Sequence, residues 1–292
     1  FTDPKLGASI TEWARHNIKE IIRQLDDEGK PVVYSDTDSI FVQAPVDNEA
    51  PTSKPQSNGL SMDSWREAKE KTLNFGEALA FRFSKEGAEL EFETALSAFF
   101  SHGAKKRYVG RVVWPREELL IRGYEVRRTD SFELLRETMT EMFELILDNQ
   151  SWSSVEMTKT AIDDVKSKKI PASKLVISRS CKGRWDSKNN RWSFDIYSNE
   201  NLPYVRAAKE RIKLGLSFTP GMKVGYIVTD ASSSPMKVEP WLVDELGTAP
   251  PDYDSEYYAK RLAKALGRIT EAFNWSEKEL LSGSRQKSLF DF

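Results

Sequence analysis

The sequence predicts an α+β fold in which a small antiparallel sheet covered by helices is followed by a mainly helical domain. Three observations support this prediction. Apolar residues recur at helical spacing near the N-terminus, short β-prone runs follow up to about residue 124, and helical spacing dominates after residue 128. The length of 292 residues suits one large domain or two modest ones.

The first helix and the first two strands are predicted from residues 8–42. An apolar stripe predicts a helix over residues 8–25, which ends at Gly29 and Pro31. In residues 32–42, two β-prone runs flank Asp-Thr-Asp-Ser, which predicts two short strands joined by a tight turn. Residues 44–61 are rich in Pro, Ser and Asn and are expected to form a loop.

A second helix and three strands complete the predicted first layer. Helical spacing returns over residues 62–83. Alternating or Val-rich runs predict strands over residues 89–96, 107–114 and 118–124. We expect these strands and the acidic hairpin to form one small antiparallel sheet that the two helices cover.

The second half is predicted to be mainly helical. Ser131 is the expected N-cap of a helix that reaches Leu147. Further helices are expected over residues 154–167, 203–214 and 254–273, a strand over residues 224–228, and irregular or short-stranded structure over residues 175–192.

The composition excludes several classes of protein. A single cysteine, Cys181, rules out an internal disulfide, and His16 and His102 alone do not have zinc-site spacing. No apolar run approaches the roughly 20 residues that cross a bilayer, and no secretory signal opens the chain, so we expect no membrane partner and a cytoplasmic protein.

The net charge of −2 hides a strong polarity along the chain. Residues 166–191 contain nine lysines and arginines against one acid, whereas residues 26–49 contain seven acids against one lysine. Either run alone can be an ordinary solvated face. Together they fit a protein that binds a polyanion and acts on phosphate.

Asp36 and Asp38 stand two residues apart in the predicted turn. Two carboxylates so close repel each other unless a cation neutralises them, and a hard divalent metal such as Mg2+ is the natural partner of oxygen ligands. The alternative is plain turn chemistry, because Asp and Ser are favoured in turns. Apolar runs on both sides favour a positioned metal site.

The stretch Tyr34-Ser35-Asp36-Thr37-Asp38-Ser39 resembles the third polymerase motif of the family B DNA polymerases, Tyr-Gly-Asp-Thr-Asp-Ser. Ser35 stands where the family has Gly, and a small residue fits this tight strand end. The resemblance implies that Asp36 and Asp38 are catalytic and bind two Mg2+ ions. It makes Asp38 the main bridging ligand and Asp36 a secondary acid.

A second motif is Lys105-Lys106-Arg107-Tyr108, at the start of a predicted strand. Adjacent cations repel one another unless an anion lies among them, although an ordinary basic strand start is the alternative. The motif resembles the Lys-Lys-Arg-Tyr segment with which family B polymerases contact the primer–template duplex near its 3′ end. The resemblance implies that Lys105, Lys106, Arg107 and Tyr108 bind DNA.

Further segments resemble the family in the same order along the chain. Residues 122–128 resemble the passage from palm to thumb, and residues 203–209 and 220–228 resemble the late thumb. Residues 252–258 resemble the segment that opens the family's last long helix. The implied domains are the C-terminal half of a palm over residues 1–128 and a thumb over residues 129–283. Thumb cations including Lys182 and Arg184 are expected to contact DNA phosphates.

Several parts of a family B polymerase have no counterpart in these 292 residues. They are the exonuclease domain, the palm motif A with a further catalytic Asp, and the fingers helix that binds the incoming dNTP. We therefore expect a DNA-directed DNA polymerase subunit that is active only with a large partner subunit, with which it shares both Mg2+ ions. The chain resembles the small subunit of the split family B polymerases of some archaea, which would make it nucleoid-associated; a fragment of an intact polymerase is the alternative.

The last nine residues, 284–292, are expected to form an exposed tail. Gln286, Leu289, Phe290 and Phe292 resemble the motif that binds a sliding clamp of the PCNA type, and also the shorter bacterial clamp motif. Docking of this apolar tail on its own domain is the alternative. A rival for the whole chain is a non-catalytic DNA-binding and clamp-tethering protein derived from a polymerase, although such a protein has no need of an acid pair that repels DNA.

Overall fold

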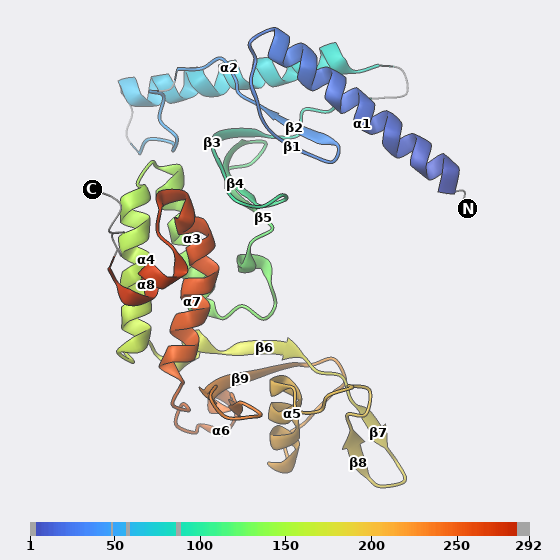
Figure 1. Ribbon diagram of the computed structural model, residues 1–292, viewed down its shortest axis with the longest axis vertical. Coiled ribbons are helices and arrows are strands. Elements are labelled where there is room, and N and C mark those ends of the chain that lie inside the picture. The colour runs from blue at the N-terminus through green and yellow to red at the C-terminus, as the bar shows by residue number, and fades with distance from the viewer. Residues whose placement is uncertain (1–3, 48, 57–58, 86–88, 285–292) are drawn as a thin grey trace, which may run out of the picture. The chain divides into compact units, whose positions relative to one another are not determined.

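The computed structural model describes residues 4–47, 49–56, 59–85 and 89–284. The chain divides into two compact units, unit 1 (Phe1–Gly123) and unit 2 (Tyr124–Phe292), whose elements are labelled in Figure 1. The boundary after residue 128 and the separate tail that the sequence suggested stay predictions. Among the described residues, no helix is long and apolar enough to cross a membrane.

The described residues of unit 1 form two long helices and five strands. The helices are α1 (Pro4–Asp27) and α2 (Leu60–Phe83). The strands are β1 (Val32–Asp36), β2 (Ser39–Val42), β3 (Ala95–Ser101), β4 (Tyr108–Trp114) and β5 (Glu118–Arg122). The α+β class predicted from the sequence is confirmed for this unit.

The strands of unit 1 form two sheets rather than the single sheet that we expected. Among the described strands, β1 and β2 of the acidic hairpin pair only with each other, and β3, β4 and β5 form an antiparallel sheet in that order. Aromatic rings join the two sheets: Tyr34 and Phe41 of the hairpin lie 5.2 Å from the ring of Tyr108 on β4. Side-chain packing therefore fixes the hairpin where backbone pairing does not.

The predicted strand over residues 89–96 is wrong in its bounds, since β3 begins at Ala95. The partner strand explains the shift: Ala95 pairs with Trp114, the last residue of β4, and Pro115 follows. Proline has no N–H with which to continue the ladder. Phe92 instead stacks on Trp114 at 4.9 Å, beside α2.

Helix α2 covers the three-stranded sheet through a small apolar core. Met62 and Trp65 of α2 are buried together with Ala95 and Val113 of the sheet. At Gly76 an added Cβ would lie 2.3 Å from the ring of Phe92, so only glycine admits this close approach.

Unit 2 combines a helical layer with a small sheet. Its helices are α3 (Glu133–Leu147), α4 (Ser151–Lys166), α5 (Pro203–Lys213), α6 (Val243–Leu246), α7 (Ser255–Thr270) and α8 (Glu277–Ser282), with single 3-10 turns at Glu125–Arg127, Ala172–Leu175 and Glu271–Phe273. Its strands are β6 (Ile177–Ser180), β7 (Arg184–Asp186), β8 (Arg191–Ser193), β9 (Lys223–Asp230) and β10 (Lys237–Pro240). Residues 175–192, expected to be irregular or short-stranded, contain the short strands β6 and β7, whereas β10, α6 and α8 were not predicted.

Two hydrogen bonds of Val228 tie the start of helix α7 to the sheet of unit 2. Strands β10, β9 and β6 form an antiparallel sheet in that order, and α5 packs against β9 and β10 (Figure 1). The N–H of Val228 on β9 donates to the buried Tyr258 hydroxyl of α7 at 3.0 Å, and the N–H of Asp254 donates to the Val228 carbonyl at 2.9 Å. These bonds hold the start of α7 against the sheet.

Ser131 is not the N-cap that the sequence suggested. Helix α3 begins at Glu133 with Phe132 as its N-cap residue, and the Ser131 hydroxyl is buried without a hydrogen-bond partner in the described part of the chain. The reason is packing: the Phe132 ring is fully buried 5.3 Å from the ring of Tyr258. Burial of this ring fixes where the helix starts.

Candidate functional site

The acidic turn is a two-residue hairpin loop with a strained first position. Asp36 pairs with Ser39 across the hairpin, so Thr37 and Asp38 form the loop. Thr37 has a φ of +56°, and the N–H of Asp38 donates to the Asp36 carbonyl at 2.7 Å. Two-residue hairpins prefer glycine where φ is positive, and for threonine this conformation costs about 1–2 kcal/mol. Strain held at such a turn is typical of functional sites.

Asp36 is neutralised by a lysine that comes from 70 residues further along the chain. Its Oδ1 accepts a hydrogen bond and ion pair from Nζ of Lys106, and another hydrogen bond from the Thr37 hydroxyl at 3.1 Å. The ammonium group of Lys106 holds the pKa of Asp36 below its usual value, and the carboxylate raises the pKa of Lys106 in return. Asp36 is therefore ionised, and its carboxylate is engaged in an ion pair with Lys106.

Asp38 differs from Asp36 in its surroundings. Its side chain is exposed, and its carboxylate accepts no hydrogen bond or ion pair from the part of the chain that the structure describes. It lines a large groove of unit 1, together with Tyr108 of β4 and Arg122 of β5. Asp38 is thus available to a cation that enters the groove.

Lys106 owes its position to two contacts of its backbone. Its φ is +64°, and its N–H donates to the Tyr34 hydroxyl at 2.8 Å. On the other side lies Gly123, with a φ of +72°, where an added Cβ would be only 2.2 Å from the Lys106 carbonyl oxygen. The hairpin and the end of β5 therefore clamp the lysine between them.

The structure brings the basic motif of residues 105–108 next to the acidic hairpin. Lys105 is exposed in the turn before β4, and the Arg107 carbonyl accepts a hydrogen bond from the Ser101 hydroxyl at 3.0 Å. Tyr108 is directed into the aromatic cluster with Tyr34. The segment thus offers cations at the edge of the acidic turn and an aromatic anchor beneath them.

The hairpin residues fit part of a magnesium site. Carboxylate oxygens are the ligands that Mg2+ prefers, and Asp36 and Asp38 are held at the tip of a short hairpin. The described residues contain no group of three or more His, Cys, Asp or Glu side chains arranged to hold a metal. Any further carboxylate ligand has to come from outside that set.

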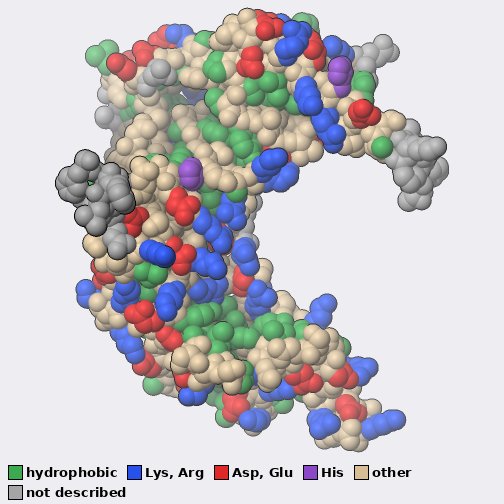
Figure 2. Space-filling view, in the orientation of Figure 1, with side chains coloured by type: hydrophobic (Ala, Val, Ile, Leu, Met, Phe, Trp, Pro, Cys, Tyr) green, Lys and Arg blue, Asp and Glu red, His purple; other side chains and the backbone are tan. Residues whose placement is uncertain are grey.

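In unit 2, most of the basic run of residues 166–191 is neutralised by acids from other elements. Among its nine cations, the ion-paired ones are Lys168 with Asp252, Lys169 with Asp164, Lys174 with Glu137, Arg179 with Asp130, and Arg184 with Asp195. Figure 2 shows basic and acidic side chains interspersed over the face of unit 2 in view. Nine cations and one acid give residues 166–191 a net charge of +8, and this sum overstates the positive electrostatic potential of the folded unit.

Of the two thumb cations singled out from the sequence, Arg184 is therefore paired, at 2.8 Å from Asp195. Lys182 has an exposed side chain with no ion pair among the described residues, and its backbone N–H donates to the Tyr197 hydroxyl at 2.7 Å. Gln286, Leu289, Phe290 and Phe292 lie outside the described residues.

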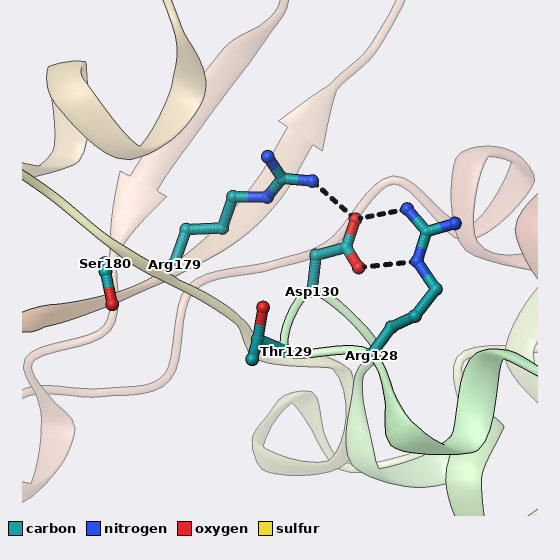
Figure 3. Close-up of a pocket in the computed structure, with 5 residues that line it drawn as sticks. All are labelled: Arg128, Thr129, Asp130, Arg179 and Ser180. Atoms are coloured by element: carbon teal, nitrogen blue, oxygen red, sulfur yellow. Dashed lines mark hydrogen bonds and ion pairs between the residues drawn. The ribbon is translucent and has the colours of Figure 1, made fainter. Parts of the chain in front are cut away.

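A second charged cluster of unit 2 surrounds Asp130, in the segment that leads into α3 (Figure 3). Its carboxylate lies between the guanidinium groups of Arg128, at 3.0 Å, and Arg179, at 2.6 Å. Hydrogen bonds from Arg128, which has the larger effect, and from Arg179 hold the pKa of Asp130 well below its usual value. The cluster joins this segment to strand β6 and leaves one net positive charge at a shallow pocket that Thr129 and Ser180 complete.

Comparison with known proteins decides the family. The family model described as DNA polymerase family B matches residues 62–273, which is most of the chain. The chain belongs to DNA polymerase family B. The motifs of residues 34–39 and 105–108 therefore lie in a member of the family that they resemble, and the α+β fold agrees with this family.

The relatives of this family B chain are much longer than the chain itself. It is 29% identical over 288 residues to DNA polymerase 2 of Aeropyrum pernix, and this alignment covers 97% of this chain and 30% of the relative. It is 26% identical to the DNA polymerase of Pyrococcus horikoshii, covering 93% of this chain and 20% of the relative. The structure of the family B DNA polymerase from Pyrobaculum calidifontis shares its fold, with a TM-score of 0.56, 22% identity, and coverage of 92% of this chain and 30% of that one.

Sequence reasoning missed the residues that hold the site together. Tyr34 and Gly123 fix the backbone of Lys106, and neither could be assigned this role without knowing that β5 ends beside the hairpin. The available signal was the isolated glycine directly after a β-prone run, which indicates a turn or a close backbone approach.

Proposed function

We propose that this family B chain supplies one part of the catalytic site of a DNA-directed DNA polymerase and part of the surface that binds primer–template DNA. The observation that carries the proposal is the contrast at the hairpin tip: Asp36 forms an ion pair with Lys106, whereas the exposed Asp38 carboxylate lines the groove and accepts no hydrogen bond or ion pair from a described residue. Both acids lie in the motif that resembles the family's catalytic one.

The two acids have different roles in this proposal. Asp38 is the main ligand to both Mg2+ ions, and Asp36 supports it while keeping Lys106 in place. Bound there, the ions would activate the primer 3′ hydroxyl and neutralise the triphosphate of the incoming dNTP. The chain's own contribution is to hold the Asp38 carboxylate in a fixed position, since the strained turn and the Lys106 ion pair leave the tip little freedom.

The chain is catalytically incomplete alone in this proposal. Two carboxylates of one hairpin cannot hold two metal ions in the arrangement that phosphoryl transfer requires. The partner is a larger polypeptide, with the exonuclease, fingers and motif A of a split polymerase.

Helix α1 is the surface that we assign to this larger polypeptide. Residues 7–13 are all exposed, and Ile10 and Trp13 are 60% and 49% exposed. Among the described side chains of α1, the one that is fully buried is Leu25, near the other end of the helix. Apolar side chains at helical spacing on an uncovered face are typical of a docking helix.

Primer–template DNA is bound by residues 105–108 in the proposal. The ammonium group of Lys106, held by Asp36, is beside the catalytic acids, where the primer 3′ end has to lie. Lys105 is exposed next to it. The tail, through Gln286, Leu289, Phe290 and Phe292, tethers the polymerase to a PCNA-like sliding clamp, which raises the local concentration of primer ends.

The test is reconstitution of the chain with a family B polypeptide that carries the exonuclease, fingers and motif A segments. We expect Mg2+-dependent primer extension from the complex and none from either part alone. Asp38→Ala should abolish extension, whereas Asp63→Ala, which removes an exposed acid of α2, should not. Unchanged extension by Asp38→Ala in an assembled complex would contradict the catalytic role and favour a DNA-binding scaffold.

A further inference from the structure

We infer that the β7–β8 hairpin of unit 2 binds an unpaired DNA strand, with Trp185 as the side chain on which a base stacks. The inference rests on the proposed polymerase function and deepens it, because it adds a single-stranded contact to the grip on the duplex. Figure 1 shows the hairpin projecting from unit 2 beyond the sheet that contains β6 and β9.

A row of aromatic rings connects the core of unit 2 to the surface of the hairpin. Phe194 and Phe218 are buried, with ring centroids 5.5 Å apart. Phe218 lies edge to face against Trp192 at 4.9 Å, and Trp192 lies 5.4 Å from Trp185. Trp185 is the outer end of the row and is 47% exposed.

The hairpin presents this ring on a fixed support. Trp185 and Trp192 are directly opposed across the strands, which is the pairing that stabilises two-stranded ribbons. The Asp186 carboxylate accepts hydrogen bonds from the loop N–H groups of Lys188 at 3.1 Å and Asn189 at 3.3 Å, and from the Asn189 side chain at 2.6 Å. A ring held in this way loses little freedom when a base stacks on it.

The cations of the basic run that lack an ion pair gather at the same hairpin. Of the nine, five are paired with carboxylates, and Lys166 donates to the Leu281 carbonyl at 2.5 Å. The remaining three are Lys182, Lys188 and Arg191, none of which has an ion pair within 4 Å with a described residue, although Arg191 acts on the carboxylate of its cross-strand partner Asp186 from farther away. A two-stranded ribbon is narrow enough to keep these charges within a Debye length, about 8–10 Å, of a ligand on the tryptophan face.

An exposed aromatic ring flanked by cations suits single-stranded DNA better than other ligands. In a duplex the base faces are already stacked on one another, so only an unpaired base offers a face to Trp185. A protein interface of ordinary size buries about 800 Å² on each partner and has an apolar centre, which one half-exposed tryptophan does not supply. Stacking combined with backbone charge is how proteins bind single strands without reading sequence.

The experiment measures binding of the full chain to three fluorescent DNA probes by anisotropy. They are an oligothymidylate of about 12 nucleotides, an abasic strand of the same length, and a duplex. Trp185→Leu keeps apolar cover over Trp192 but removes the aromatic face, Trp185→Phe keeps an aromatic face, and Trp152→Leu removes another exposed tryptophan, on α4. Circular dichroism checks that each variant is folded.

We expect Trp185→Leu to weaken oligothymidylate binding by roughly 5- to 100-fold and to leave abasic-strand and duplex binding unchanged. Trp185→Phe should retain most of the affinity, and Trp152→Leu should match the unaltered chain. Equal affinities of Trp185→Leu and Trp152→Leu for oligothymidylate would overturn the inference, and so would an equal loss on the abasic strand. In either case intact duplex binding would leave the proposed function standing, whereas failure of the unaltered chain to bind any probe would count against both.

Discussion

Gly123 is the position where the backbone of unit 1 most directly fixes the candidate site. It has a φ of +72°, and a Cβ added there would lie 2.2 Å from the carbonyl oxygen of Lys106 and 2.9 Å from Cγ of Arg107. Carbon–oxygen contacts in proteins are about 3.3 Å or longer, so the Lys106 carbonyl would have to move by roughly 1 Å. Substitution to alanine should therefore disturb Lys106 without touching its side chain.

The size of the effect follows from two contributions to the free energy of unfolding. A left-handed conformation costs alanine about 1 kcal/mol. Forcing a methyl group into a filled site adds about 1–3 kcal/mol, for a total of about 2–4 kcal/mol. Gly29 is a matched control in the same unit, with a φ of +69° and nothing within 4 Å of an added Cβ, so Gly29→Ala should lose only the first contribution.

Urea unfolding of the two variants measures both losses, and duplex binding measures the consequence for Lys106. We expect Gly123→Ala to be less stable than Gly29→Ala by about 1–3 kcal/mol and to bind primer–template DNA more weakly. Equal stabilities and equal DNA affinities would refute the reasoning, because they would show that the Lys106 backbone is not clamped by Gly123.

Three further predictions concern unit 2 and the tail. Burial raises the pKa of Tyr226 to about 12, so the stabilisation from its neutral hydroxyl is present below pH 10 and is lost as the pH rises through 12. Between pH 9 and pH 11.5, the free energy of unfolding in urea should therefore fall by about 2 kcal/mol more for the unaltered chain than for Tyr226→Phe. In a plot of the logarithm of duplex affinity against the logarithm of salt concentration, Lys182→Ala should make the slope shallower by about 0.9. Lys174→Ala should leave this slope unchanged, because the Lys174 cation is paired with Glu137. Equal slopes for the two variants would show that Lys182 does not contact phosphate. Deletion of residues 286–292 should remove clamp-stimulated synthesis by the complex and spare distributive synthesis, and equal stimulation after truncation would show that the tail has another role.

Local patterns predicted much of the fold, because each depends on neighbours in the sequence. The hairpin of residues 32–42 and the helix ending at Phe83 have nearly the bounds that periodicity and turn residues indicate. The strand expected from residue 89 failed because its end depends on Pro115 in the partner strand. Similarly, Phe132 rather than Ser131 occupies the N-cap position of α3, without a capping hydrogen bond, because its ring is buried against α7.

The candidate site was predictable in its chemistry but not in its contacts. The acid pair could be found from residue types and flanks alone. The ion pair between Asp36 and Lys106 could not, since it joins residues 70 apart and depends on Tyr34 and Gly123. Charge counting failed for a related reason: acids such as Glu137, from other elements, neutralise most of the basic run.

The most direct test of the account compares the two acids of the hairpin in the reconstituted polymerase. Single-turnover primer extension would be measured with Asp38→Asn and Asp36→Asn, which remove one negative charge each and keep the side-chain shape. Because Asp38 is the available metal ligand and Asp36 is occupied by Lys106, we expect a loss of roughly a thousandfold or more for Asp38→Asn and a clearly smaller one for Asp36→Asn. Extension that survives in Asp38→Asn, or that suffers more in Asp36→Asn, would contradict the account.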